Sequence, residues 1–222
     1  MKVGTDSILL GAWVALPGLK AAPKRVLDIG CGCGLLGLML AQRTAGKAEI
    51  IGVEIDELAA RQAAQNVAQS PWPQSMTIHS GDISDFTGEP SFDVIISNPP
   101  YFINSLQGPQ ASRNTARHTD TLTQQQLLLN AARLLTDDGV FYLILPVDAA
   151  KQLLQISEAA GLFLHQLAYV HTKQGKPVHR YLMAFARSAA AVVESTVVDI
   201  YDVNNQYSNQ FIALTRDFYL NR

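Results

Sequence analysis

The segment Asp28–Gly37, with the sequence DIGCGCGLLG, decides the fold class of this chain. The apolar run Val26–Ile29 predicts a buried strand, and the leucine-rich run that follows the glycines predicts a helix ending near Arg43. A strand, a glycine turn and a helix in this order are typical of the first unit of a parallel α/β sheet. Glycines at the turn let the backbone bend sharply and approach a ligand without a Cβ in the way.

Strands and helices alternate along the chain beyond this segment. Apolar and β-branched runs predict strands at 49–54, 76–79, 92–97 and 140–145, and amphipathic runs predict helices at 57–69, 124–135 and 149–160. Asp56 and Thr123 are placed to cap two of these helices, and residues 137–139 (DDG) predict a turn. The alternation implies right-handed crossovers and a doubly wound, mostly parallel sheet.

The C-terminal third predicts a different arrangement. The runs 163–171 and 178–186 predict two strands, and the loop 173–176 (KQGK) between them is so short that they must be antiparallel. We therefore expect an α/β fold with a Rossmann-like, seven-stranded, mostly parallel sheet and an antiparallel C-terminal hairpin. Residues 1–187 are expected to form one domain with a lead-in at 1–24, and residues 188–222 a strand–helix appendage packed on it.

Composition narrows the class of protein. The chain has 222 residues, of which 48% are hydrophobic and 16% charged, and this excludes disorder over its whole length. No apolar stretch reaches the roughly 18 residues that cross a bilayer, so no membrane association is expected. Two cysteines and an acidic Asp6 near the start predict a cytoplasmic protein. Because the formal net charge is −2, any nucleic acid would have to be bound by a local basic patch.

The glycine loop leaves more than one ligand open. From Gly32 it matches G-x-G-x-x-G, and Glu54 lies at the right distance to bind ribose hydroxyls, so a dinucleotide site is one alternative. Asp28 argues against it, because a carboxylate repels a pyrophosphate but suits the cationic amino group of S-adenosylmethionine. A glycine turn without a ligand is the other alternative. Cys31 and Cys33 are two thiols where a metal site needs three or four ligands, so we expect no metal.

A second motif, Asn98-Pro99-Pro100-Tyr101, follows the predicted strand 92–97. Ligands of a parallel sheet lie at the carboxyl ends of its strands, so this motif and the glycine loop should face one crevice. The prolines lack N–H groups and fix φ, which leaves their carbonyls as rigid acceptors. Asn98 adds a side-chain acceptor and Tyr101 an aromatic face, a combination that fits an exocyclic amino group on a flat ring. An ordinary strand-ending turn is the alternative.

The glycine loop and Asn98–Tyr101 together resemble the Rossmann-like, S-adenosylmethionine-dependent amino methyltransferases, which modify adenine, cytosine or a glutamine side-chain amide. More narrowly, Lys2–Trp13, Asn98–Phe102 and Leu214–Leu220 are similar to the bacterial valine-tRNA adenine-N6 methyltransferases. The resemblance covers essentially the whole chain. It implies a class I methyltransferase fold, S-adenosylmethionine as the cofactor, and methylation of the adenine just 3′ of the anticodon.

The resemblance also implies roles for particular residues. The catalytic residues would be Asn98, Pro99, Pro100 and Tyr101, and the cofactor-binding residues Asp28, Gly30, Gly32, Gly34, Glu54 and Asp82. Asp82 would face the amino group of the cofactor adenine, with an exposed turn aspartate as the alternative. Residues 4–6 (GTD) would lie near the methionine end, although helix capping explains Asp6 equally well. The expected partner is the anticodon loop of a tRNA, bound by a monomer.

Two basic clusters are candidates for RNA contact, with ordinary solvated surface as the alternative for both. They are Arg113, Arg117 and His118 in the polar segment 107–120, and Lys173, Lys176, His179 and Arg180 on the hairpin. A protein glutamine-amide methyltransferase of the same fold, an NAD-dependent oxidoreductase and a non-catalytic nucleotide-binding module are the alternative functions. The last two leave Asn98–Tyr101 unexplained.

Overall fold

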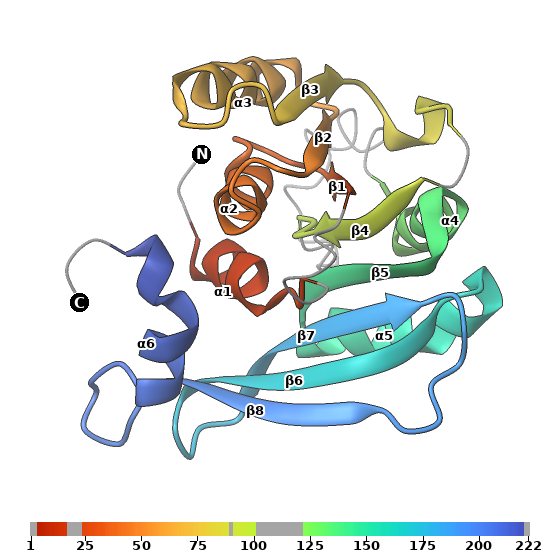
Figure 1. Ribbon diagram of the computed structural model, residues 1–222. Coiled ribbons are helices and arrows are strands. Elements are labelled where there is room, and N and C mark those ends of the chain that lie inside the picture. The colour runs from red at the N-terminus through yellow and green to blue at the C-terminus, as the bar shows by residue number, and fades with distance from the viewer. Residues whose placement is uncertain (1–3, 17–23, 89–90, 101–121, 220–222) are drawn as a thin grey trace, which may run out of the picture.

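A single eight-stranded sheet organises the protein, as seen in a computed structural model that describes residues 4–16, 24–88, 91–100 and 122–219 (Figure 1). Its strand order is β3-β2-β1-β4-β5-β7-β6-β8. The strands are β1 Arg25–Ile29, β2 Glu49–Glu54, β3 Met76–Ser80, β4 Phe92–Ser97, β5 Leu135–Pro146, β6 Phe163–Lys173, β7 Val178–Ala186 and β8 Glu194–Tyr201. The first five are parallel to one another, and β7 is antiparallel to both β5 and β6.

Helices cover both faces of the sheet (Figure 1). They are α1 Thr5–Trp13, α2 Leu35–Arg43, α3 Glu57–Gln69, α4 Gln124–Leu134, α5 Val147–Ser157 and α6 Asn209–Thr215, with short 3₁₀ turns η1 Ile83–Asp85, η4 Glu158–Ala160 and η5 Arg216–Phe218. Residues of α1, α2 and α6 share one buried apolar cluster, and residues of α4 and α5 share a second. Among the described residues, no helix has both the length and the apolar character to cross a membrane.

The central strands are apolar on both sides because each side faces a helical layer. In β4, Val94 and Ile96 belong to the cluster under α1 and α2, whereas Ile95 belongs to the cluster under α4 and α5. Successive side chains of a strand point to opposite faces, so the continuous apolar run of residues 94–96 fits a strand that is covered by helices on both faces.

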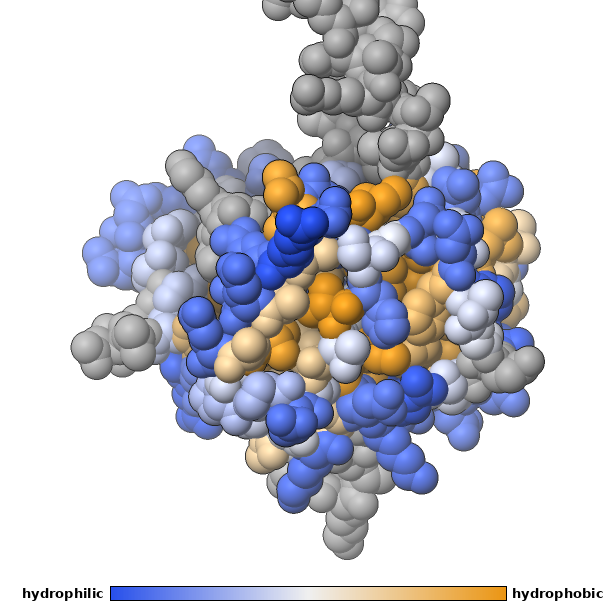
Figure 2. Space-filling view, turned by 90° about the horizontal axis from the view of Figure 1, so that it is seen from above, coloured by the Kyte–Doolittle hydropathy of each residue, from blue (hydrophilic) through white to orange (hydrophobic). Residues whose placement is uncertain are grey.

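On the outer surface, Figure 2 shows hydrophilic residues around most of the visible face and hydrophobic ones gathered toward its middle.

The order of the strands reverses between β1 and β4. From β1 the chain proceeds through β2 to β3 on one side, and from β4 it proceeds to β5 on the other. In open α/β sheets such a reversal leaves a crevice at the carboxyl ends of the two strands, which is where ligands bind. The buried Ser97 hydroxyl joins these two ends, since it donates a hydrogen bond to the Ile29 carbonyl at 2.8 Å.

The structure confirms the predicted α/β fold and the antiparallel β6–β7 hairpin, and it corrects the number of strands from seven to eight. The additional strand is β8, which was assigned to the appendage but pairs in parallel with β6 from Glu194 to Tyr201. The prediction that a turn at 137–139 precedes the strand was also wrong. These residues lie within β5, where the register with β4 shifts between Phe92 and Val94.

Both predicted helix caps are confirmed. Asp56 accepts a hydrogen bond from the Ala59 N–H at the start of α3. At the start of α4, Thr123 and Gln126 bond reciprocally to each other's backbone as a capping box. These short-range contacts depend only on residues three positions apart, and this is why the sequence was sufficient to predict them.

Candidate active site

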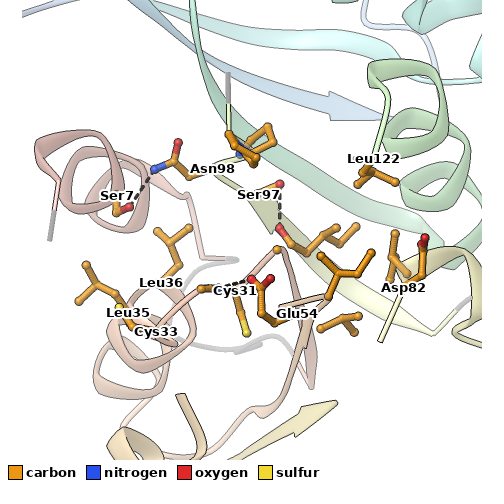
Figure 3. A pocket seen from close by; sticks show the side chains of 18 of the residues that line it. Ser7, Cys31, Cys33, Leu35, Leu36, Glu54, Asp82, Ser97, Asn98 and Leu122 are labelled. Atoms are coloured by element: carbon orange, nitrogen blue, oxygen red, sulfur yellow. Dashed lines mark hydrogen bonds between the residues drawn. The ribbon is translucent and has the colours of Figure 1, made fainter. Parts of the chain in front are cut away.

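A cavity of about 330 Å³ opens where β1, β2 and β4 end, at the reversal of strand order (Figure 3). The glycine loop lines it, together with Glu54 after β2, Asp82 after β3 and residues 97–100 after β4. The start of α1 contributes its N-cap residue Gly4 and Ser7 of its first turn. Two motifs about sixty positions apart in the sequence thus meet in one cavity, as their places after parallel strands predicted.

The glycine loop adopts a conformation that favours glycine at three positions. Gly30, Gly32 and Gly34 have φ values of 70°, 57° and 82°, in the left-handed region that a Cβ disfavours. The loop is also tied to β2, because the Gly30 N–H donates to the Val53 carbonyl at 2.9 Å. These three predicted cofactor-binding residues therefore have a backbone reason to be glycine, and Gly30 and Gly32 lie on the cavity wall.

The two predicted carboxylates at the ends of β2 and β3 both lie on the cavity wall. Glu54 is buried, with one oxygen accepting from the Gly32 N–H at 2.8 Å and the other from the Asp56 N–H at 2.9 Å. Asp82 is half-buried and accepts from the Ser84 N–H at 2.8 Å as the cap of η1. Figure 3 shows the two carboxylates coming from neighbouring strand ends of the same cavity.

Asp28 lies beneath the loop and is not among the residues that line the cavity. Its fully buried side chain accepts a hydrogen bond from the Gly37 N–H of α2 at 3.1 Å, and no described residue donates to its Oδ1. Burial raises the pKa of Asp28 to about 7, and although the Gly37 N–H opposes this shift, the nearby Glu54 adds to it. The predicted contact between Asp28 and a ligand's amino group stays a prediction.

Asn98 is positioned by an interaction that sequence reasoning missed. Its Nδ2 donates to the Ser7 hydroxyl at 2.8 Å, across 91 positions of sequence (Figure 3). No described residue donates to the Asn98 Oδ1. Pro99 is buried, Pro100 is exposed, and both line the cavity. Tyr101 lies outside the described residues. The sequence signal for Ser7 was its place in the segment Lys2–Trp13, on which the family resemblance rests, but that signal gave Ser7 no role.

Cys31 and Cys33 have no metal-ligand companions among the residues that the structure describes. In the described part of the chain, His, Cys, Asp and Glu side chains do not gather in groups of three that could hold a metal ion. Cys31 is buried against Gly52 of β2, and burial, with the charges of Asp28 and Glu54, raises the pKa of its thiol. It is therefore a neutral thiol at physiological pH, packed as a small apolar residue.

The two basic clusters have different outcomes. Arg113, Arg117 and His118 lie outside the described residues.

On the hairpin, Arg180 forms an ion pair with Asp6 at 2.9 Å, with side chains only 15% and 22% exposed, so its charge is already matched. Lys173 donates to the Asn205 side-chain oxygen at 2.7 Å, which is a neutral partner, and Lys176 is exposed. In the sheet, Arg180 of β7 lies opposite Pro146, the last residue of β5. The cluster is therefore at the edge of the sheet where the parallel strands end, as the cavity is.

The cavity wall fits a cationic, adenosine-containing ligand better than a dinucleotide. It holds Glu54 and Asp82, while no lysine or arginine occurs among the described lining residues. In dinucleotide sites a helix N-terminus receives the pyrophosphate, but here the Asp28 carboxylate already accepts from the first turn of α2. Ile55, Ile83 and Leu122 provide apolar surface for a flat ring. The residues present thus fit S-adenosylmethionine.

The chain is similar in sequence to known proteins. Residues 5–161 match the family model described as "Methyltransferase small domain". A protein of Mannheimia succiniciproducens is 47% identical over 223 residues, covering 100% of this chain and 88% of its own length. One of Tolumonas auensis is 45% identical over 220 residues, covering 99% of this chain and 90% of its own length. Both are named tRNA1(Val) (adenine(37)-N6)-methyltransferase.

Solved structures agree at the level of the fold. A predicted O-methyltransferase from Agrobacterium tumefaciens superposes with a TM-score of 0.71 at 17% identity, covering 96% of each chain. A TehB-like S-adenosylmethionine-dependent methyltransferase from Corynebacterium glutamicum gives 0.54 at 20% identity, covering 82% of this chain and 87% of its own.

The fold and the site thus define a class I methyltransferase, in which a glycine loop after the first strand and a polar motif after the fourth share one cavity. The chain belongs to the methyltransferase small domain family, in the group of its relatives named tRNA1(Val) (adenine(37)-N6)-methyltransferase.

Proposed function

We propose that this protein transfers the methyl group of S-adenosylmethionine to the N6 amino group of adenine 37 in a valine tRNA, in the cytoplasm. The names of relatives that are 45% and 47% identical over nearly the whole chain support the substrate. The observation that carries the chemistry is Asn98 at the cavity edge, with its amide nitrogen bonded to Ser7 and its oxygen without a described donor.

The cofactor would lie between the glycine loop and the carboxylates that follow β2 and β3. Glu54 would receive the ribose hydroxyls, and Asp82 the amino group of the adenine ring, with Ile83 and Leu122 beside that ring. The bound cofactor supplies an electrophilic methyl group. The carboxylates of this wall complement its net positive charge, whereas they would repel a pyrophosphate.

Asn98 would act on the substrate amine. The N6 amine of adenine is a weak nucleophile because its lone pair is delocalised into the ring. If the Asn98 oxygen and the Pro99 carbonyl accept its two hydrogens, the geometry in which that lone pair faces the methyl group is favoured. Tyr101 would hold the ring by stacking, which contributes about 1–3 kcal/mol per base.

The substrate base has to leave its stack to reach a pocket of this kind. Enzymes that modify a base extrude it from its stack at a cost of a few kcal/mol, and the cost is lowest for unpaired bases. A base in the anticodon loop is single-stranded, so the RNA itself meets part of this requirement. A glutamine side-chain amide presents a similar two-hydrogen donor, which makes a protein substrate the competing outcome.

Two measurements test this function. In thermal unfolding, S-adenosylmethionine at about 100 times its Kd should stabilise the protein by about 2.7 kcal/mol, while NAD at the same concentration should not. Labelled methyl groups should then pass from the cofactor to purified tRNA and not to the proteins of an RNA-free cell extract. Stabilisation by NAD alone, or labelling of protein alone, would contradict the proposal.

A further inference from the structure

The contact between Ser7 and Asn98 joins the N-terminal helix to the motif after β4. Ser7 is the third residue of α1, and its hydroxyl lies 2.8 Å from the Asn98 Nδ2. Both residues line the cavity, and Figure 3 shows their side chains pointing toward each other from α1 and from the end of β4. The side-chain nitrogen of Asn98 is thereby engaged away from the rest of the motif.

The position of Ser7 is fixed by the packing of α1. The three residues that follow it, Ile8, Leu9 and Leu10, are buried. Asp6 forms its ion pair with Arg180 of β7, and Arg43 of α2 donates to the Gly11 carbonyl at 2.8 Å. The helix is therefore fixed by contacts with a strand and with a neighbouring helix. The Ser7 hydroxyl consequently has a fixed position from which to bind Asn98.

The orientation of Asn98 matters because its carboxamide has two chemically different ends. The oxygen accepts hydrogen bonds and the NH₂ group donates them, and rotation by half a turn about the last side-chain bond exchanges the two. Only the oxygen can accept a hydrogen from a substrate amine. A rotated side chain would present two hydrogens to the hydrogens of that amine, which is repulsive.

We propose that Ser7 is a positioning residue, whose hydroxyl holds the Asn98 carboxamide with its nitrogen away from, and its oxygen toward, the substrate amine. The inference rests on the proposed function of Asn98 as the acceptor. Ser7 accepts from the Asn98 nitrogen and so holds the carboxamide at the cavity edge before the substrate arrives, with the oxygen available to the substrate amine. Without Ser7 the side chain is free to turn away from this position.

Methyl transfer to tRNA gives the first readout. Ser7→Ala should lower kcat by about 5- to 100-fold, the rate equivalent of one lost hydrogen bond to a polar group, while the Kd of S-adenosylmethionine and the Tm change little. Ser7→Thr, which restores the hydroxyl, should recover kcat to within about threefold of wild type. Ser195→Ala, which removes an exposed hydroxyl from β8, is the matched control.

A double-mutant cycle tests whether Ser7 acts through Asn98. In single-turnover experiments on the Asn98→Ala background, adding Ser7→Ala should cause no further loss, because the group that Ser7 orients is gone. A Ser7→Ala effect of full size on that background would overturn the inference, since Ser7 would then act on the reaction by another route.

Side-chain NMR of the protein without ligands gives a readout independent of activity. The Asn98 NH₂ resonances, assigned by their loss in Asn98→Ala, should shift in Ser7→Ala and stay in place in Ser195→Ala. Unshifted resonances would overturn the inference, and so would shifted resonances with kcat unchanged. If the wild type transfers no methyl group to tRNA, the proposed function fails, and the NMR result still decides whether Ser7 orients Asn98.

Discussion

At the scale of single residues, the carboxylates of the site differ in what they bond to. Each oxygen of Glu54 accepts a hydrogen bond from a backbone N–H, one in the glycine loop and one at the start of α3. Glu54 nevertheless lies on the cavity wall. Asp28 bonds to the first turn of α2 and lies under the loop. Glu54 can therefore contact a ligand directly, whereas the described hydrogen bond of Asp28 is to α2, the helix that follows the loop.

Glu54 should contribute to cofactor affinity through its charge. Replacing it with Ala removes an acceptor for ribose hydroxyls, and S-adenosylmethionine binding should weaken by about 1.5–3 kcal/mol, the range for hydrogen bonds to a charged group. Calorimetry measures the affinity. Glu54→Gln is the control, because its amide oxygen can still accept from the Gly32 N–H and preserve the loop. Unchanged affinity in Glu54→Ala would remove this residue from the cofactor site.

Asp28 should make stability depend on pH. Its folded pKa of about 7 is raised above the ordinary value of 3.8, so between these values the folded state binds a proton that the unfolded state has released. Stability from this group is therefore greatest at low pH and falls as pH rises toward 7. Relative to Asp28→Asn, the wild-type free energy of unfolding should fall by about 2–3 kcal/mol between pH 5 and pH 8.

Urea unfolding of both proteins across this pH range measures the difference. Asn is a suitable reference because its side-chain oxygen can still accept from the Gly37 N–H. Parallel stability curves for the two proteins would show that Asp28 has the same pKa in the folded and unfolded states, which would contradict its burial as the dominant influence.

At the scale of elements, an ion pair as well as apolar packing holds α1 in place beside the site. The partly buried Asp6–Arg180 pair links it to β7. In a double-mutant cycle with Ala at each position, the pair should show a coupling of about 1–3 kcal/mol in urea unfolding. The exposed Glu57–Arg61 pair, with both side chains 68% exposed, is the control and should couple by only about 0.3–0.5 kcal/mol. Additive effects at Asp6 and Arg180 would remove this pair as an anchor of α1.

Local patterns predicted most of the elements, and long-range pairing explains what they missed. Residues 49–54 and 92–97 were predicted with the bounds of β2 and β4, because apolar runs and turn residues suffice for that. β8 pairs with β6 through a register that no short window contains, so the strand was predicted but its place in the sheet was not. Ser7 is a partner of Asn98 only in three dimensions.

At the scale of the whole molecule, a net charge of −2 leaves RNA binding to local contacts. Because Arg180 is paired with Asp6, Lys173 and Lys176 are the remaining lysine or arginine side chains of the hairpin cluster. Each phosphate contact adds about 0.7–0.9 to the salt slope of log K. We predict a slope that corresponds to about three to five contacts, and its reduction by about 1.4–1.8 when both lysines are changed to Gln.

Filter binding to tRNA over a range of salt concentrations measures this slope. Changing Lys24 and Lys47 to Gln is the matched control, because both are exposed and precede β1 and β2 at the opposite edge of the sheet. That control alters net charge equally and should leave the slope unchanged. If the two pairs of substitutions had equal effects, the RNA would not be bound at the hairpin.

Methyl transfer to one adenine through Asn98 can be tested with a matched pair of tRNA transcripts. A valine tRNA transcript and its copy with guanine at position 37 are incubated with S-adenosylmethionine, and nucleosides are identified by mass spectrometry after digestion. We predict one N6-methyladenosine per tRNA with adenine 37 and none with guanine 37. With Asn98→Ala we predict at most the trace that single-turnover experiments resolve, even though that variant binds the cofactor within a few-fold of wild type. Equal methylation of both transcripts, or near-normal turnover by Asn98→Ala, would contradict this mechanism.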